Sequence, residues 1–252
     1  MQDKTDVIVL SLMDYKEKDS LVKVFSREKG MLTFVARGLN AMESKNRMAC
    51  LPYGLSQFLY DDHETKGLQS LKTAQSLESR YKIQEDLEKS SIASLIVELT
   101  DLLMTSNLDL NEREAYFTYL NQIFHLLNFE SKPKHLMAYA LFRFLDAYGI
   151  APQVDACVLC GSTQINSISI EEGGFICHEC QHELHSPLFS VDILKDFRVI
   201  HKVNDANLMD YLNYREPHPT VLKILMDFLE FHTGHSPKAW EFIQKWSIME
   251  TL

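Results

Sequence analysis

The chain has 252 residues, of which 46% are hydrophobic, and it carries a net charge of −10 at pH 7. No apolar run approaches the roughly 18 residues that a membrane span needs, and the N-terminus is acidic where a secretory signal would be basic. The sequence therefore predicts a soluble, cytosolic protein with reduced thiols, built as one large domain or two to three small ones.

The charge is unevenly distributed along the chain. Residues 1–80 contain 12 Lys/Arg and 11 Asp/Glu, a balance of +1, so residues 81–252 carry the remaining −11. Binding to phosphates depends on local clusters of Lys and Arg. If any region of this chain contacts nucleic acid, we expect it to be the first 80 residues.

The first 80 residues have the pattern of short β-strands. Apolar and β-branched runs separated by turn residues predict five strands, at 7–10, 20–25, 31–36, 55–60 and 68–76. Five short strands in this length are typical of a small barrel or sandwich. The OB-fold belongs to that class and often binds single strands, although strand number alone does not distinguish it from an SH3-like barrel.

Helical periodicity replaces the strand pattern after residue 80. Pro133 favours the start of one helix and Gly149 its end, whereas Gly234 and Pro237 separate the last two helices. Apolar residues at helical spacing predict helices over 84–105, 112–129, 133–148, 190–202, 205–213 and 219–233, with a last one from 236.

Four of the five cysteines form two C-x-x-C pairs inside this helical region. Cys157 and Cys160 precede Cys177 and Cys180, with sixteen residues between the pairs. This spacing is typical of a structural zinc site, in which four thiolates leave no position open for water or substrate. Redox use, or a relic site that no longer binds metal, are the alternatives. Such a module is expected to hold the surrounding helices together.

The sequence contains no persuasive catalytic motif. His178, Glu179 and His182 match H-E-x-x-H, but Cys177 and Cys180 bracket them, so we expect a zinc knuckle rather than a helix and no metalloprotease. One of the three histidines near the second pair, His178, His182 or His185, could replace a thiolate as a ligand, although histidines at such positions are more often solvated loop residues. Cys50 is expected to be an ordinary buried thiol. The protein is therefore predicted not to be an enzyme.

Basic and aromatic residues alternate in the first region, as in barrels that bind single strands. Phe25 and Phe34 lie in apolar runs and are assigned to the core. The loop 37–47 is the better candidate surface. The candidate DNA-binding residues are Arg27, Lys29, Arg37, Lys45 and Arg47, and the interleaved aromatics are Phe25, Phe34, Tyr53 and Phe58.

Several segments, taken in order, resemble one family. They are residues 14–15, 19–22, 25–30, 36–38, 157–161 and 228–232 with Gly234. Together with the order of barrel, helices, cysteine pairs and further helices, they are similar to the bacterial recombination mediator RecO over essentially the whole chain.

The resemblance implies an α+β multidomain fold. A five-stranded OB-fold barrel for DNA binding would occupy 1–80, and an all-helical domain would follow. That domain would comprise 81–150 and 189–252, with a zinc-binding module inserted at 151–188, where Cys157, Cys160, Cys177 and Cys180 hold a structural Zn²⁺.

The resemblance also implies a non-enzymatic function in DNA repair and recombination after DNA damage, in a RecF-type pathway. Such proteins bind single- and double-stranded DNA, anneal complementary strands, and with RecR help to load RecA onto strands coated by single-strand-binding protein (SSB), whose acidic C-terminal tail they contact. Arg37, Lys45 and Arg47 would contact phosphates, and Lys134 and Arg143 are candidate contacts for the tail. The protein would be cytoplasmic and associated with the nucleoid, not with membranes.

The loop after Ala36-Arg37-Gly38 departs from the family pattern. Members usually carry a densely basic loop there, whereas residues 39–44 of this chain include no Lys or Arg and only Lys45 and Arg47 follow. We therefore expect weaker, more salt-sensitive DNA binding and greater reliance on partner proteins. The alternative function is a zinc-stapled protein-interaction adaptor with little direct DNA contact.

Overall fold

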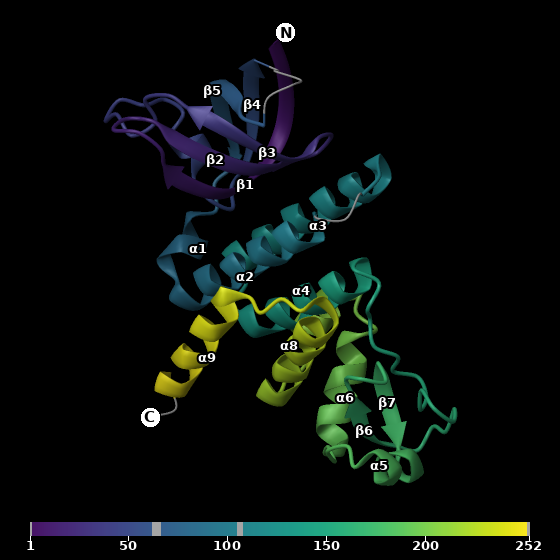
Figure 1. Ribbon diagram of the computed structural model, residues 1–252. Coiled ribbons are helices and arrows are strands. Elements are labelled where there is room, and N and C mark those ends of the chain that lie inside the picture. Colours follow the sequence, from purple (N-terminus) through teal and green to yellow (C-terminus); the bar gives the residue numbers. More distant parts are fainter. Residues whose placement is uncertain (1, 62–66, 105–107, 251–252) are drawn as a thin grey trace. The chain divides into compact units, whose positions relative to one another are not determined.

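A computed structural model describes residues 2–61, 67–104 and 108–250 (Figure 1). The chain divides into two compact units, an N-terminal unit (Met1–Ser131) and a C-terminal unit (Lys132–Leu252). The N-terminal unit contains the predicted strands and also the first three helices, so it extends beyond residue 80.

Five strands form a closed barrel in the order β1-β2-β3-β5-β4. All neighbours are antiparallel except β3 and β5, which pair in parallel, with Phe34 opposite Gln69. Pairing of β1 with β4 closes the barrel. This is the predicted OB-fold arrangement. The strands are β1 (Gln2–Asp14), β2 (Ser20–Ser26), β3 (Gly30–Ala36), β4 (Leu55–Asp61) and β5 (Gln69–Glu78).

Strand β1 is much longer than the predicted 7–10. Its first half pairs with β4 and its second half with β2, and the register shifts between Val9 and Ser11, where the strand bends from one neighbour to the other. The apolar centre, 7–10, is buried, and outside it only Thr5 of this strand is buried as well. The hydrophobic pattern therefore identified the centre of the strand, while its polar ends are set by pairing.

The barrel interior is filled by β-branched and aromatic side chains. Phe34 lies edge-to-face with Phe58 and Tyr60, with ring centroids 5.2 and 5.1 Å apart. Phe25 is also fully buried, but on the outer face, where its ring lies 5.6 Å from that of Tyr116 in the third helix. The assignment of Phe25 and Phe34 to the core is confirmed, as is burial of Cys50.

Three helices complete the N-terminal unit. The single helix predicted over 84–105 is two helices, because Asp86 adopts an extended conformation and its side chain accepts a hydrogen bond from the backbone N–H of Lys89, which caps the second. Position 105 itself lies outside the described residues. Asp109 and Glu112 form a capping box on the third helix. The helices are α1 (Tyr81–Glu85), α2 (Leu87–Leu103) and α3 (Leu110–Phe129).

A buried arginine joins the barrel to α3. Arg80 is 1% exposed and donates from Nη1 to the carbonyl oxygen of Tyr53 at 3.1 Å. Its Nη2 donates to Glu78 at 2.8 Å and to Asn121 of α3 at 2.5 Å. Three acceptors from the unit hold the two Nη groups of this buried cation, whereas its buried Nε has no hydrogen-bond partner among the described residues.

The C-terminal unit is mainly helical. Pro133 occupies the first turn of its first helix, and Gly234, with φ of +68°, ends α8 in the left-handed conformation, as the sequence predicted. Phe197 and Phe228 meet in the core with ring centroids 6.1 Å apart. The helices are α4 (Pro133–Ala147), α6 (Val191–Ile200), α7 (Leu208–Leu212), α8 (Pro219–Thr233) and α9 (Lys238–Glu250).

The cysteine module lies between α4 and α6 in sequence. It contains a hairpin of β6 (Ile165–Ser169) with β7 (Gly174–Cys177), followed by α5 (His178–Leu184). The prediction of a knuckle without helix at 178–182 is wrong. Cys177 is extended and begins the helix, and the left-handed His185 ends it after two turns, so the bracketing cysteines do not prevent helical geometry.

Gly174 is required by the packing of this module. The segment before Cys157 pairs with the hairpin through Gln153, and a Cβ at Gly174 would lie 2.3 Å from the carbonyl oxygen of Gln153. Only glycine permits this approach of two backbones. Among the described residues, no helix is long and apolar enough to cross a membrane.

Candidate nucleic-acid interface and metal centre

The loop 37–47 lies at one end of the barrel, where side-chain hydrogen bonds fix it to the turn between β1 and β2. Asn40 donates from Nδ2 to Asp14 at 2.9 Å, its Oδ1 accepts from Ser20 at 3.1 Å, and its backbone N–H donates to the carbonyl oxygen of Lys18. One asparagine therefore binds three points of the neighbouring turn. The loop and the turn form one continuous surface, which we call the barrel end.

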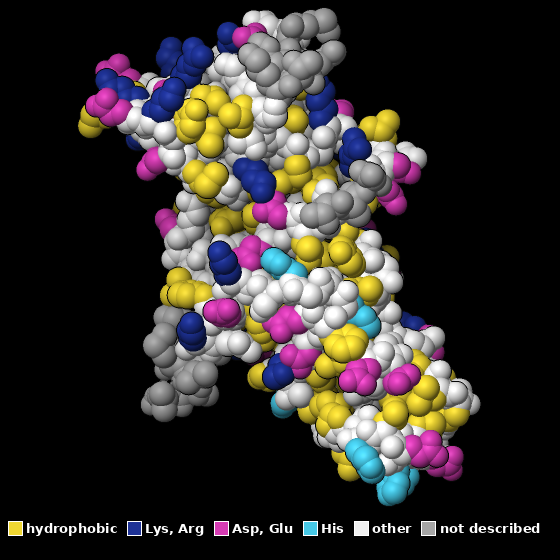
Figure 2. Space-filling model, viewed as in Figure 1, with side chains coloured by type: hydrophobic (Ala, Val, Ile, Leu, Met, Phe, Trp, Pro, Cys, Tyr) yellow, Lys and Arg dark blue, Asp and Glu magenta, His cyan; other side chains and the backbone are white. Residues whose placement is uncertain are grey.

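The exposed cations of the barrel end come from both segments. The loop contributes Arg37, Lys45 and Arg47, the residues predicted to contact phosphates, and all three are exposed. Arg47 donates a hydrogen bond to the carbonyl oxygen of Asn40 at 3.1 Å. The turn adds Lys16 and Lys18, which are also exposed. Within the described part of the chain, no carboxylate pairs with any of these five cations. Figure 2 shows Lys and Arg side chains gathered over these loops at the left of the barrel.

Sequence reasoning missed Lys16 and Lys18. The signal that could have found them is the fold itself, because OB-fold barrels bind oligonucleotides partly through the loop between their first two strands. Glu17 and Glu43 are exposed on the same segments, so the barrel end has an excess of positive charge but a modest one.

Arg27 and Lys29 lie on the turn between β2 and β3 and are engaged by other parts of the unit. Arg27 forms an ion pair with Glu114 of α3 at 3.0 Å, and its guanidinium lies 4.4 Å from the ring centroid of Phe117. Lys29 forms an ion pair with Asp3 at 2.7 Å. The structure does not bring these two residues together with Arg37, Lys45 and Arg47 by any described contact, and their role in DNA binding stays a prediction.

The aromatic residues that alternate with the cations are mostly core. Phe25, Phe34 and Phe58 are fully buried and Tyr53 nearly so. Tyr15 in the β1–β2 turn is 44% exposed, with the ammonium of Lys16 5.2 Å from its ring centroid. The barrel end therefore offers cations for phosphates and few surfaces on which bases could stack.

The four paired cysteines of the C-terminal unit converge on one point. All four Sγ atoms lie within 4.8 Å of one another, and those of Cys160 and Cys177 are 3.5 Å apart. A tetrahedral Zn–S distance of about 2.3 Å places sulfurs about 3.8 Å apart, so the cluster matches a metal site. Cys157 and Cys177 are buried, whereas Cys160 is exposed. The four cysteines are positioned to hold a metal ion.

The thiols of this cluster compete for negative charge. Burial raises the pKa of Cys157, but backbone N–H groups of Cys177, Cys160 and Leu159 stabilise its thiolate more, and its pKa falls to about 6. Burial, and then hydrogen bonds to the neighbouring thiols, raise the pKa of Cys180 far above its ordinary value. Several thiolates in so small a volume need a cation to neutralise them, which is what a divalent metal supplies.

The nearby histidines lie outside this group. His178, His182 and His185 are exposed on and after α5, and the metal-binding group found among the described residues consists of the cysteines alone. Although α5 is a helix, the H-E-x-x-H residues do not share a cluster with the thiols. A site filled by four sulfurs matches the structural kind of zinc centre, not the open catalytic kind.

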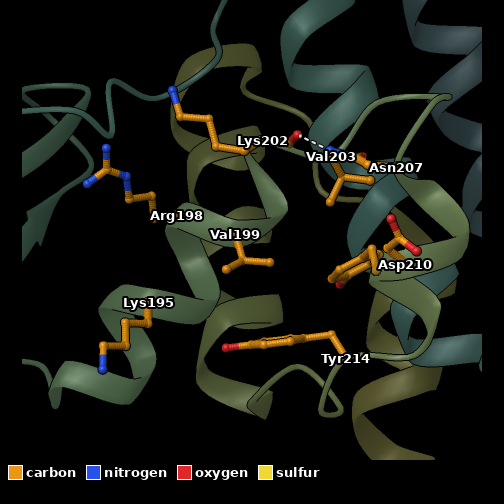
Figure 3. A pocket seen from close by; sticks show the side chains of 9 residues that line it. Lys195, Arg198, Val199, Lys202, Val203, Asn207, Asp210 and Tyr214 are labelled. Carbon is orange, nitrogen blue, oxygen red and sulfur yellow. Dashed lines mark hydrogen bonds between the residues drawn. The ribbon is translucent and has the colours of Figure 1, made fainter.

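A second surface of the C-terminal unit is a groove of about 490 Å³ between α6 and α7. Lys195 and Arg198 from α6 and Lys202 from the turn after it line the groove, together with Val199 and the ring of Tyr214 (Figure 3). Sequence reasoning did not identify this cationic groove. The spacing of the three cations between residues 195 and 202 was its only local signal in the sequence.

Lys134 and Arg143, the residues predicted to contact an acidic tail, do not line the cationic groove. Lys134 forms an ion pair with Glu216 at 2.9 Å.

Comparison with known proteins adds the family. The family model "Recombination protein O N terminal" matches residues 1–80, and "Recombination protein O C terminal" matches residues 84–241. A DNA repair protein RecO from Halalkalibacterium halodurans is 27% identical over 252 residues, which cover 97% of this chain and 95% of the relative. Relatives of the same name from Desulforamulus reducens and Bacillus cereus are 25% identical over 96% of this chain and 94% of theirs, and 30% identical over 75% of each, respectively. This chain is therefore a member of the RecO family of DNA repair proteins.

Proposed function

We propose that the protein binds single- and double-stranded DNA at the barrel end and anneals complementary strands without bond-making chemistry. The observation that carries this proposal is the fixed surface formed by the loop 37–47 and the β1–β2 turn. It holds five exposed cations that no described carboxylate neutralises. Cations without a carboxylate partner can release counterions from a phosphate backbone, which provides most of the affinity for nucleic acid.

Annealing follows from the composition of this surface. Two strands repel each other through their phosphates, and a surface that neutralises both backbones lowers that barrier. Phosphate contacts position a strand without reading or holding its bases. Because the aromatic residues of the barrel are core and Tyr15 is the exposed one in the turn, bound bases would stay free to pair.

We propose further that the cationic groove binds a partner segment of the opposite charge, the acidic C-terminal tail of SSB. Lys195, Arg198 and Lys202 would attract the carboxylates of such a tail, and the apolar floor at Val199 and Tyr214 would take an apolar side chain. Contact with SSB would bring the protein to coated strands, where with RecR it would help to load RecA. The names of the relatives support a role of this protein in DNA repair in general terms.

For the metal, we propose a structural Zn²⁺ held by Cys157, Cys160, Cys177 and Cys180. Thiolate ligands in a tetrahedral arrangement favour zinc over the harder cations of the cell. The ion would supply charge neutralisation and folding energy to the hairpin and α5. It would take no part in DNA chemistry.

The test of DNA binding is a charge reversal, Arg37→Glu with Arg47→Glu. Binding and annealing of complementary fluorescent oligonucleotides, bare and SSB-coated, are measured at low salt for the wild type and this variant. We expect a loss of at least tenfold in affinity and in annealing rate. The matched control, Lys82→Glu with Lys89→Glu, makes the same charge change on α1 and α2 and should lose much less.

The alternative function makes a different prediction in this assay. If the protein were a zinc-stapled interaction adaptor, the wild type itself would neither bind nor anneal bare oligonucleotides at low salt, yet it would still bind an SSB tail peptide. The cationic groove is the feature that favours this reading. Equal losses in the two double variants would mean that the total charge matters and the barrel end does not.

A further inference from the structure

A second groove of the C-terminal unit has the opposite character to the cationic one. It has a volume of about 310 Å³ and lies between the β6–β7 hairpin, the segment 184–189 and α8. Buried Ile168 and Ile224 and half-buried Ile170 and Phe189 form its apolar lining. Glu171 and Glu172, from the hairpin turn, form its rim. We call this the acidic groove.

The walls of the acidic groove are fixed by hydrogen bonds. On one side, the ring Nε2 of His232 in α8 lies 3.1 Å from the carbonyl oxygen of Ile170 and ties the hairpin turn to that helix. On the other, Ser167 donates to the carbonyl oxygen of Pro187 at 2.7 Å, and the N–H of Phe189 donates to Asn166. The groove therefore exists before any ligand arrives, which lowers the entropic cost of binding.

The charge at the rim is negative and largely uncompensated. Glu171 and Glu172 are exposed, and no Lys or Arg among the described residues pairs with either. Asp227 also lines the groove, and Lys223 one turn earlier on α8 neutralises it at 2.6 Å. The potential of the groove is thus set by two free carboxylates, which repel phosphates and attract cations.

An exposed apolar strip continues from the groove. Leu184 lines it, and Leu188 and Val191 beyond are 67% and 64% exposed, although large apolar side chains are normally covered. Figure 2 shows hydrophobic and acidic side chains side by side over the part of the unit that contains β6 and β7. Contiguous apolar surface beside a polar rim is a mark of protein-interaction sites.

We propose that the acidic groove and this strip bind a short segment of a partner protein in which Lys or Arg alternates with aliphatic residues. The aliphatic side chains would fill the apolar lining, and the basic ones would pair with Glu171 and Glu172. Nucleic acid is excluded as the occupant by its charge. This site goes beyond the proposed DNA annealing function, because it lies in the other compact unit and has the opposite polarity from the barrel end.

The test uses three fluorescein-labelled hexapeptides and the full chain, followed by anisotropy at about 50 mM salt, where surface charges are only partly screened. One peptide alternates lysine with leucine, a second lysine with serine, and a third glutamate with leucine. The lysine–leucine peptide should bind at least tenfold more tightly than either of the others, because only it matches both the charge and the apolar lining.

The variant Glu171→Gln with Glu172→Gln should weaken binding of the lysine–leucine peptide about tenfold. Its matched control, Glu179→Gln with Glu183→Gln, removes two exposed carboxylates from the neighbouring α5 and should leave the affinity within twofold of the wild type. Oligonucleotide annealing should be unchanged in both variants, which separates this site from the proposed function.

Three results would overturn the proposal. Equal loss of peptide affinity in the two double variants would show that only the overall negative charge of the unit attracts the peptide. Equal affinity for the lysine–serine peptide would show that the apolar lining is not used. Leu184 is an exposed lining residue, so its replacement should not affect folding. Unchanged affinity of Leu184→Ser for the lysine–leucine peptide would also show that the apolar lining is not used.

Discussion

The carboxylate of Asp155 accepts a hydrogen bond from the ammonium of Lys202 at 3.0 Å. The same carboxylate pairs with Arg198 at 3.1 Å. The hydrogen bond from Lys202 is the main reason why the pKa of Asp155 lies below its ordinary value. Asp155 precedes the first metal-ligand candidate, Cys157, by two residues, so the cysteine module already supplies an anion to two of the three cations of the cationic groove.

Asp155 should therefore compete with an acidic ligand of that groove. We expect Asp155→Asn to tighten binding of a fluorescein-labelled acidic peptide about fivefold, since Arg198 and Lys202 would no longer be shared with an internal carboxylate. Asp146→Asn on α4 is the matched control with the same charge change. Weaker binding in Asp155→Asn would show instead that the aspartate positions the two cations.

Arg27 and Arg37 should differ in what their loss affects. Arg27→Gln removes an ion pair with Glu114 and a stacking contact with Phe117, and we expect it to lower the free energy of unfolding of the N-terminal unit by about 1 kcal/mol. Arg37→Gln should leave stability unchanged and weaken DNA binding. Urea unfolding and anisotropy titrations measure the two effects. A larger loss of DNA affinity in Arg27→Gln than in Arg37→Gln would instead place Arg27 in the DNA interface.

The dependence of DNA affinity on salt should be shallow, which replaces the greater salt sensitivity expected from the sequence, because a surface that contacts few phosphates releases few counterions. The barrel end offers five cations without carboxylate partners, so a single strand can release counterions from at most about five phosphates there. We expect a slope of log K against log salt no steeper than about −3.5. Anisotropy titrations over a series of salt concentrations measure it. A slope near −7 would mean that a second surface also contacts the backbone.

Metal removal should affect one unit and spare the other. We expect one Zn²⁺ per chain by elemental analysis, and its loss in Cys160→Ser, since three thiolates bind less tightly than four. Hydrogen exchange should then accelerate in the hairpin and α5 and remain unchanged in the barrel. If a zinc-free variant kept wild-type protection from hydrogen exchange throughout residues 153–188, the metal would have no structural role.

Acid should weaken the junction between the barrel and α3. Burial raises the pKa of Glu78, but hydrogen bonds from Arg80 and His125 outweigh it and hold that pKa below the ordinary 4.5. A carboxyl with a lowered folded pKa contributes stability that is complete above 4.5 and is lost as the pH falls through the folded value. Unfolding measured from pH 6 down to pH 3 should therefore show a smaller loss in Glu78→Gln than in the wild type.

The control for that measurement is Arg80→Met, which removes the partner and keeps the volume. It leaves the acceptors on Tyr53, Glu78 and Asn121 unsatisfied, so we expect a loss of about 3 kcal/mol at neutral pH. If Glu78→Gln and the wild type lost stability equally in acid, other carboxylates would account for the decline.

Local patterns were enough to predict most elements of this fold, although not α5. Alternation of apolar and polar residues identified five strands, and helical spacing identified the helices, because both patterns depend on residues within a few positions of one another. The patterns failed at β1 because a long-range contact decides its length: pairing with two partners extends the strand beyond its apolar centre. They failed at Asp86 for a local reason, because its side chain caps α2 through the N–H of Lys89 and so divides a predicted helix in two.

The sequence by itself determined that four cysteines would gather around one point, since the spacing within each C-x-x-C pair is a local property of the chain. It did not determine which cations of the barrel are free to bind phosphates. That depends on partners far away in sequence, such as Glu114, 87 positions after Arg27, and on Asn40, which joins the loop 37–47 to the turn carrying Lys16 and Lys18. Only the tertiary structure brings such residues together, and it decides the availability of a charge because a carboxylate partner within the fold competes with a ligand for it.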